Sequence, residues 1–239
     1  MLGNLDLKNV LVIDIETVPQ FSEFGHLNDH WKDFWSHKMK YVIKEGVPVE
    51  ETYERAGIYA EFGKIICISA GCFYNDSNEM KFRLKSYHGD DEKVLLQEFS
   101  EMLENNYNKE EHLICGHNAK EFDFPYIARR CLINGIPIPS ILDNSGKKPW
   151  EVRLLDTMEM WKFGDYKSYT SLKLLAALFG ITSPKDDIDG SQVGNIYWKE
   201  KNIERIKTYC QKDVVTVAQI LLKFKGMTLL KEENVDYAN

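Results

Sequence analysis

Ten residues near the N-terminus, VLVIDIETVP from Val10 to Pro19, constrain this chain more than any other stretch. Their β-branched apolar run predicts a buried strand at residues 10–16. Asp14 and Glu16 interrupt it, and because side chains two positions apart on a strand face the same way, both carboxylates project from one face. Two neighbouring buried carboxylates repel each other, so they need a cationic partner. A basic side chain from elsewhere in the chain and a divalent metal ion both satisfy that need.

The rest of the sequence predicts a mixed α/β sheet flanked by helices. Apolar runs and alternating patterns predict further strands at residues 64–74, 79–88, 112–116 and 152–156. Helical spacing predicts helices at residues 90–106, 124–134, 171–180 and 202–224. The first three strands form an antiparallel meander, and the later ones alternate with helices as parallel strands do. We therefore expect a five-stranded sheet with residues 10–16 as a central strand, whose polar end opens on a crevice.

A long insertion, residues 20–62, separates the first two strands. It is rich in aromatic side chains, namely Trp31, Phe34, Trp35, Tyr41, Tyr53 and Tyr59. These rings either anchor a helical insertion to the sheet or stack on nucleic-acid bases. We prefer packing, which is the more common role of aromatic residues at helical spacing. With 239 residues, 44% of them hydrophobic, the chain is expected to form a single domain, residues 1–239, that includes the insertion.

Charge and hydropathy narrow the classes of function. A net charge of −7 argues against a classical nucleic-acid-binding protein, which neutralises many phosphates with lysine and arginine, but not against an enzyme that holds a few nucleotides. No apolar run reaches the roughly 20 residues that span a bilayer, so we expect no membrane partner and a cytoplasmic location. The five cysteines form no CxxC pair, which indicates reduced, buried thiols.

Two further stretches carry carboxylates in informative places. In CGHNAKEFDFPYIARR, Asp123 stands at the start of a helix that follows a short strand, where an N-terminal cap explains it equally well. In YCQKD, Tyr209 and Asp213 are four residues apart and therefore lie on one face of the last helix. The neighbours of this pair are apolar, so the face points inward. A carboxylate beside a buried apolar stripe again needs a partner.

Together, VIDIETVP, NAKEFDFPYIARR and YCQKD resemble the three motifs of the DEDD superfamily of 3′–5′ exonucleases, which have a ribonuclease H-like fold. The tyrosine four residues before the last aspartate resembles the DEDDy branch. Between Val10 and Phe224 the pattern is similar to a stand-alone bacterial family related to the proofreading exonuclease domain of family-B DNA polymerases, a likeness that LDTMEMW, SYTSLKLLAALFG and SPKDDIDGSQV extend.

The resemblance implies a set of functional residues. The metal ligands would be Asp14, Glu16, Asp123 and Asp213, whose hard oxygen atoms suit two Mg²⁺ or Mn²⁺ ions. Tyr209 would orient the attacking water by a hydrogen bond, because a phenol with a pKa of about 10 is a poor base at neutral pH. The implied activity is two-metal hydrolysis of single-stranded or frayed 3′ ends of DNA to nucleoside 5′-monophosphates.

Substrate contacts are assigned more loosely. By resemblance, Asn118 positions the terminal nucleotide. We expect auxiliary phosphate contacts from Lys120 and Lys185, with Lys162 or Lys167 as further candidates, although solvated surface charges would look the same in the sequence.

Other polar residues receive structural interpretations. Asp156, at the end of a strand beside the expected crevice, is interpreted as a structural carboxylate, and His117 as a structural histidine. His26 and His30 have helical metal-ligand spacing but no evident third ligand, so we assign them to the surface or to packing.

Two other functions remain open. A ribonuclease of the RNase D type uses the same constellation on RNA, and nothing in these motifs reads a 2′-hydroxyl group. A catalytically silent module that binds nucleic acid, or a polymerase or repair partner, would keep the fold without the reaction.

Overall fold

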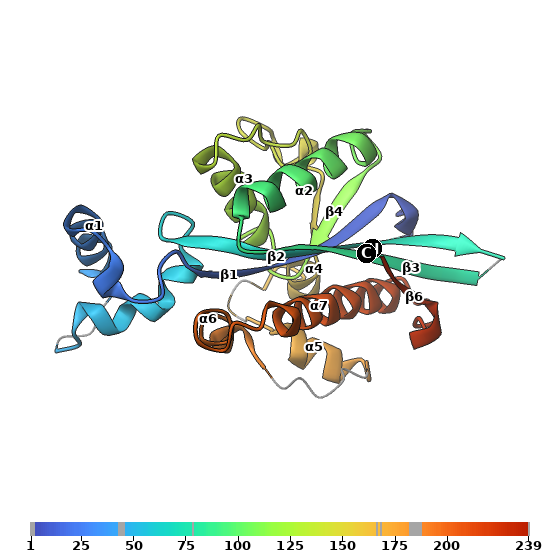
Figure 1. Cartoon of the computed structure of the whole chain (residues 1–239). Coiled ribbons are helices and arrows are strands. Elements are labelled where there is room, and N and C mark those ends of the chain that lie inside the picture. Colours follow the sequence, from blue (N-terminus) through green and yellow to red (C-terminus); the bar gives the residue numbers. More distant parts are fainter. Residues whose placement is uncertain are drawn as a thin grey trace.

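The computed structural model describes residues 3–42, 46–77, 79–165, 167, 169–181 and 188–238. Its centre is a mixed six-stranded sheet in the order β5-β4-β1-β2-β3-β6 (Figure 1). The strands are β1 (Val10–Pro19), β2 (Gly63–Asp76), β3 (Glu79–His88), β4 (Leu113–Gly116), β5 (Leu154–Asp156) and β6 (Val235–Ala238).

The meander and the interior position of the first strand are confirmed. β1 pairs antiparallel with β2, which pairs antiparallel with β3, while β4 and β5 run parallel to β1 and to each other. β1 therefore has a neighbour on each side. Its register against β2 shifts between Glu16 and Thr17, so the ladder is irregular directly after the second carboxylate.

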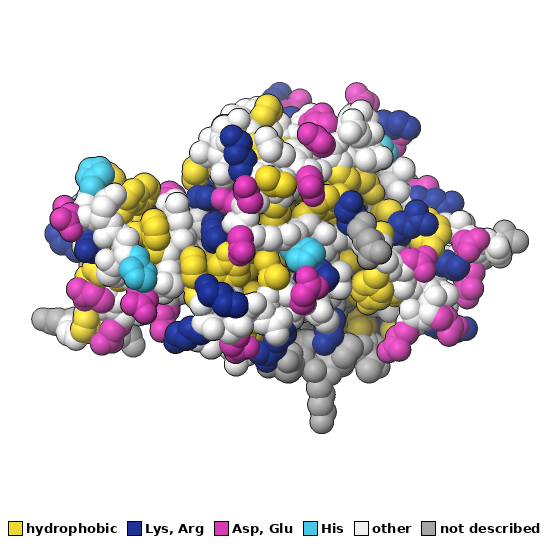
Figure 2. All heavy atoms as spheres, in the orientation of Figure 1, with side chains coloured by type: hydrophobic (Ala, Val, Ile, Leu, Met, Phe, Trp, Pro, Cys, Tyr) yellow, Lys and Arg dark blue, Asp and Glu magenta, His cyan; other side chains and the backbone are white. Residues whose placement is uncertain are grey.

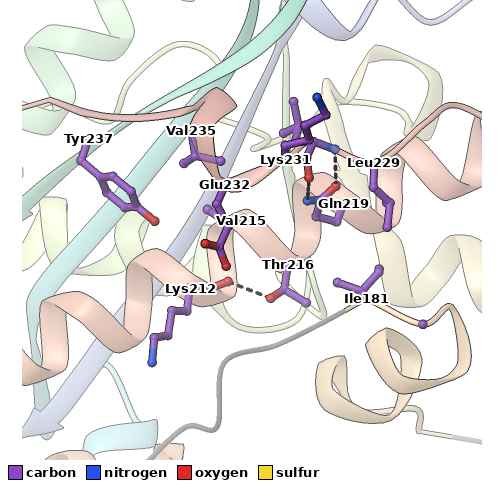
Figure 3. A pocket seen from close by; sticks show the side chains of 12 residues that line it. Ile181, Lys212, Val215, Thr216, Gln219, Leu229, Lys231, Glu232, Val235 and Tyr237 are labelled. Carbon is purple, nitrogen blue, oxygen red and sulfur yellow. Dashed lines mark hydrogen bonds between the residues drawn. The ribbon is translucent and has the colours of Figure 1, made fainter.

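The expected count of five strands is wrong, because β6 joins the sheet parallel to β3, with Val235 opposite Phe82. Four residues are too few to show a strand pattern. The segment before β6 is held by the side chain of Gln219 on α7 (Figure 3). The amide oxygen of Gln219 accepts a 3.0 Å hydrogen bond from the N–H of Leu230, and its amide NH₂ donates a 2.9 Å hydrogen bond to the Leu230 carbonyl. β6 thus depends on tertiary contacts rather than on local preference.

Helices cover both faces of the sheet (Figure 1). The α-helices are α1 (Asp29–Met39), α2 (Glu92–Asn106), α3 (Asp123–Ile133), α4 (Thr157–Lys162), α5 (Leu172–Leu178), α6 (Val193–Asn195) and α7 (Ile203–Phe224). The 3₁₀-helical segments are η1 (Leu7–Asn9), η2 (Phe24–His26), η3 (Val49–Ile58), η4 (Pro149–Glu151), η5 (Gly190–Gln192) and η7 (Glu232–Asn234). η6 (Ile196–Glu200) is a π-helical turn.

Local features explain two of the helix ends. The helix expected from residue 90 begins at Glu92, because the Asp91 carboxylate accepts hydrogen bonds from the N–H groups of Lys93 and Val94. α3 ends before Gly135, whose positive φ of 69° suits a residue without a side chain.

Successive side chains of β1 point to opposite faces of the sheet and pack in two separate parts of the core. Leu11, Ile13 and Ile15 pack with residues of α2 and α3, while Val10 and Val12 pack with residues of α7. Asp14 and Glu16 continue the even-numbered series, so the strand period directs both carboxylates toward the α7 side.

The insertion has its own apolar cluster and extends from one end of the sheet (Figure 1). Trp35 and Tyr53 are buried, with ring centroids 5.4 Å apart, as the packing interpretation requires. Trp31 and Phe34 are partly exposed, but Trp31 packs edge-on against Phe62 with ring centroids 5.5 Å apart. Packing therefore explains most of these rings, and Tyr41, which is 83% exposed, is the clear exception.

Two smaller expectations can be compared with the structure. All five cysteines are free, and all but Cys72 are buried. Within the described residues, no helix is long and apolar enough to cross a membrane.

Candidate active site

All five residues expected to be catalytic line one cleft of about 650 Å³. Asp14 and Glu16 come from β1 and Asp123 from the first turn of α3. Tyr209 and Asp213 come from α7, which packs across the sheet face onto which the even-numbered residues of β1 project.

Asp123 is joined to β1 directly. Its Oδ1 atom accepts a hydrogen bond of 3.1 Å from the backbone N–H of Ile15, the residue between the two β1 carboxylates. Asp123 is the first helical residue of α3 rather than its cap, and no side chain caps that end of the helix. The carboxylate is therefore held toward the strand, which the cap interpretation did not anticipate.

The electrostatics of the cleft favour a bound cation. Burial, reinforced by the neighbouring carboxylates, raises the pKa of Asp14 and of Glu16 well above the usual range. Burial also raises the pKa of Asp123 to about 7, although the N–H of Ile15 opposes this. In the described part of the chain, no lysine or arginine forms an ion pair with these three carboxylates.

The donor atoms fit a divalent ion with hard ligands. The Oδ2 atom of Asp14 is buried and has no hydrogen-bond partner. Ligand atoms of Asp14, Glu16 and Cys210 lie within 4.8 Å of one another. Burial raises the pKa of the Cys210 thiol, which therefore stays protonated, and its Sγ lies 3.4 Å from the backbone oxygen of Asp14. The carboxylates, not the thiol, are the ligands that this site offers.

Tyr209 is set up as a hydrogen-bond donor. Burial and the nearby charges of Asp213, Glu16 and Asp14 raise the pKa of its phenol, so the hydroxyl keeps its proton at neutral pH. The Nζ atom of Lys173 lies 5.9 Å from the centre of the Tyr209 ring, in an adjoining pocket of about 290 Å³.

A tight loop presents Asn118 to the cleft. Asn118 has a positive φ of 58°, and its side-chain oxygen is buried without a hydrogen-bond partner. The Asp156 carboxylate accepts hydrogen bonds of 3.0 Å from the N–H groups of Asn118 and Lys120, and it also caps α4 through Met158 and Glu159. Asp156 thus stabilises the loop that carries Asn118 through backbone hydrogen bonds, which agrees with its interpretation as a structural carboxylate.

His117 also has a structural environment. Its ring nitrogens lie 2.9 Å from the Thr157 hydroxyl and 2.9 Å from the Thr170 carbonyl oxygen. Burial lowers the pKa of the imidazole. A neutral ring that donates to Thr170 from Nε2 fits this geometry.

Lys120, which was expected to contact phosphate, does not lie among the described residues lining this cleft. The ammonium group of Lys120 pairs with Glu159, and Lys162 and Lys167 do not line the cleft either. Lys185 lies outside the described residues. Their role in substrate binding stays a prediction.

Three residues that sequence reasoning missed lie at the cleft and its adjoining pocket. Arg55 of η3 and Tyr169 line the cleft, and Lys173 lines the adjoining pocket. Tyr169 and Lys173 lie in SYTSLKLLAALFG, whose resemblance to the exonuclease family gives no role to either residue. Arg55 lies in the insertion, where no motif marks it, because only the folded chain brings it to the carboxylates.

Fold and cleft together define an α/β protein with an acidic pocket built by one central strand and two helices. Residues 58–237 match the family of predicted 3′–5′ exonucleases related to the exonuclease domain of PolB. The chain belongs to this family. The matched segment contains Asp123, Tyr209 and Asp213, whereas Asp14 and Glu16 precede it.

One solved structure gives a more distant comparison. The chain is similar to a chain from the structure of the yeast NOT1 MIF4G domain co-crystallised with CAF1, at 13% identity and a TM-score of 0.44. The match covers 96% of this chain and 84% of the other. So distant a likeness adds nothing to the functional assignment.

Proposed function

We propose that the protein is a metal-dependent 3′–5′ exonuclease of the DEDDy type, with a ribonuclease H-like fold. It would act on single-stranded or frayed 3′ ends of DNA and release nucleoside 5′-monophosphates. One observation carries the proposal: in a member of a predicted exonuclease family, the four expected metal-binding carboxylates and Tyr209 line a single cleft.

The side chains of Asp14, Glu16, Asp123 and Asp213 would hold two Mg²⁺ or Mn²⁺ ions. Their oxygen ligands, the raised pKa values of Asp14, Glu16 and Asp123, and the unpartnered Oδ2 atom of Asp14 support this assignment. When bound, such ions supply an activated water and stabilise the departing 3′ oxygen.

The protein's own groups would position the reactants. β1 holds Asp14 and Glu16 on one rigid strand, and the Ile15 N–H keeps Asp123 beside them. Tyr209 would donate a hydrogen bond that orients the attacking water. The buried amide oxygen of Asn118, on a loop supported by Asp156, would contact the terminal nucleotide.

The test incubates 5′-labelled single strands of DNA and RNA with the protein and Mn²⁺. We expect DNA ladders that shorten from the 3′ end. Asp14→Asn should slow the reaction by about 1,000-fold, since metal-ion catalysis supplies several kcal/mol of transition-state stabilisation. Asp33→Asn, which removes an exposed carboxylate of α1, is the matched control and should retain activity. Intact DNA and RNA with every divalent metal would overturn the proposal, and shortening of RNA alone would make the protein a ribonuclease.

A further inference from the structure

One wall of the acidic cleft comes from η3, at the end of the insertion. η3 contributes Glu54, Arg55, Gly57 and Ile58 to the lining, and all but Ile58 precede the segment that matches the family model. Among the described residues that line the cleft, Arg55 is the one lysine or arginine. The acidic residues that line it are Asp14, Glu16, Glu54, Asp123 and Asp213.

η3 is attached to the elements that carry the carboxylates. The carbonyl oxygen of Gly57 accepts two hydrogen bonds of 2.8 Å, from the hydroxyl groups of Thr17 and Tyr126. Thr17 follows Glu16 on β1, and Tyr126 lies on α3, which begins at Asp123. These two contacts hold the end of η3 at a fixed place relative to the metal-binding side chains.

Close backbone packing fixes the same point. A Cβ atom on Gly57 would lie 3.1 Å from the backbone of Val18, a tight contact that would push η3 and β1 apart slightly, so glycine favours this close approach. Arg55 is two residues away, within the 3₁₀-helical segment η3.

The guanidinium group of Arg55 is available to a ligand. Arg55 is exposed, and in the part of the chain that the structure describes no hydrogen bond or ion pair engages its side chain. By contrast, Arg130 is buried with Glu92, and Lys120 pairs with Glu159. A guanidinium offers a planar set of donors that matches a phosphate.

On the face drawn in Figure 2, acidic and basic side chains are interspersed. Besides Arg55, one lysine or arginine, Lys173, lies in the pocket that adjoins the cleft, among the residues that the structure describes. A single strand carries one phosphate charge per nucleotide, and a cleft lined by carboxylates repels each of them unless a cation stands nearby. Ions at the carboxylates would compensate only the phosphate that reacts, so the next phosphate along the strand needs a separate cation.

We propose that Arg55 binds the phosphodiester immediately 5′ of the scissile one, which makes the insertion a substrate-positioning element. This inference rests on the proposed exonuclease function, because it places a nucleic-acid strand in the cleft. A substrate that has only the reacting phosphate cannot make this contact with Arg55.

The test compares two substrates. Thymidine 5′-monophosphate p-nitrophenyl ester has only the reacting phosphate, and a labelled ten-residue oligothymidylate has the next one as well. Arg55→Ala should lower kcat/KM for the oligonucleotide about tenfold, mainly through KM, and for the ester less than about twofold. The kcat/KM of Arg55→Lys for the oligonucleotide should lie between the values of the wild type and of Arg55→Ala. The control Lys40→Ala removes an exposed positive charge from the same insertion, outside the cleft, and should leave both rates unchanged.

Binding gives an independent readout. With Ca²⁺ in place of Mn²⁺, fluorescence anisotropy follows binding of the labelled oligothymidylate at several salt concentrations. Losing one phosphate contact should reduce the slope of log Kd against log salt by about 0.7 in Arg55→Ala. Equal melting temperatures would show that Arg55→Ala is folded, and Arg55→Gln gives a second neutral variant of similar length.

The outcomes separate the two proposals. An oligonucleotide rate that is unchanged in both neutral variants, or equal losses on both substrates, would overturn the role of Arg55. If the wild-type protein hydrolyses neither substrate, the exonuclease function fails. Arg55-dependent binding in Ca²⁺ would then still support the contact, and its absence would overturn it.

Discussion

Both the residue type and the surroundings of Tyr209 suit it to donate a hydrogen bond. A phenol is a poor base at neutral pH, and burial with three nearby carboxylates raises its pKa further. We expect Tyr209→Phe to lower kcat roughly 10- to 100-fold through loss of water orientation, with Mn²⁺ affinity retained. Activity assays and isothermal titration with Mn²⁺ measure the two effects. A loss of activity as complete as in Asp14→Asn would refute the assigned role.

His117 predicts a pH dependence of stability. Its pKa is lowered in the folded protein, so the stability it contributes is present above the unfolded pKa of about 6.5 and is lost as pH falls through the lower folded value. His117→Gln remains neutral at every pH. We expect the variant to be less stable by about 1 kcal/mol at pH 7.5, and this gap to shrink at pH 5.

Urea unfolding at the two pH values measures that gap. His37→Gln, which alters an exposed histidine on α1, serves as the control and should not change with pH relative to the wild type. A gap for His117→Gln that stays constant or widens toward pH 5 would show that the imidazole is not held neutral.

Among the secondary-structure elements, α2 and α3 are joined by a buried ion pair. Arg130 of α3 pairs with Glu92 of α2, and it also donates to the carbonyl of Ala60 at the end of the insertion. Glu92 in turn accepts a 2.7 Å hydrogen bond from the N–H of Ile65 on β2. One pair therefore connects two helices, a strand and the insertion.

Removing Arg130 should be costly for this reason. Arg130→Ala leaves the Glu92 carboxylate buried without its cation, which typically destabilises a protein by about 3–5 kcal/mol. Urea unfolding measures the loss, with the less buried neighbour Arg129→Ala as a control of the same charge change. A loss below about 1 kcal/mol would mean that water or a rearrangement compensates Glu92.

For the molecule as a whole, the cleft makes stability dependent on divalent ions. Repulsion among buried carboxylates disfavours the metal-free fold, and ligands that bind only the folded state stabilise it. At 100 times its Kd, Mn²⁺ should add about 2.7 kcal/mol, seen as a higher melting temperature than in EDTA. Asp14→Asn should abolish most of this gain, and Asp33→Asn should keep it. The same melting temperature with Mn²⁺ and with EDTA would contradict a metal site.

The regular parts of the sheet were predictable because local patterns define them. β1, β2 and β3 have the apolar runs and alternation that strands require. The antiparallel pairing of β2 with β3 follows from their short connection, whereas β1 pairs with β2 across the long insertion. The sequence did not predict β6, because this four-residue strand depends on its pairing with β3 and on the hydrogen bonds between Gln219 and Leu230. The insertion was expected to pack, and its buried rings do, but the sequence could not tell Trp35 from the partly exposed Trp31.

What the sequence alone determined is the part of the site that follows from backbone periods. Asp14 and Glu16 share a face because a strand repeats every two residues, and Tyr209 and Asp213 share one because a helix repeats every 3.6. Only the tertiary structure decided that Asp123 bonds to Ile15, that Lys120 turns to Glu159 and that Arg55 enters the cleft. Those contacts join residues far apart in the chain, and the packing of whole elements selects them where no local period does.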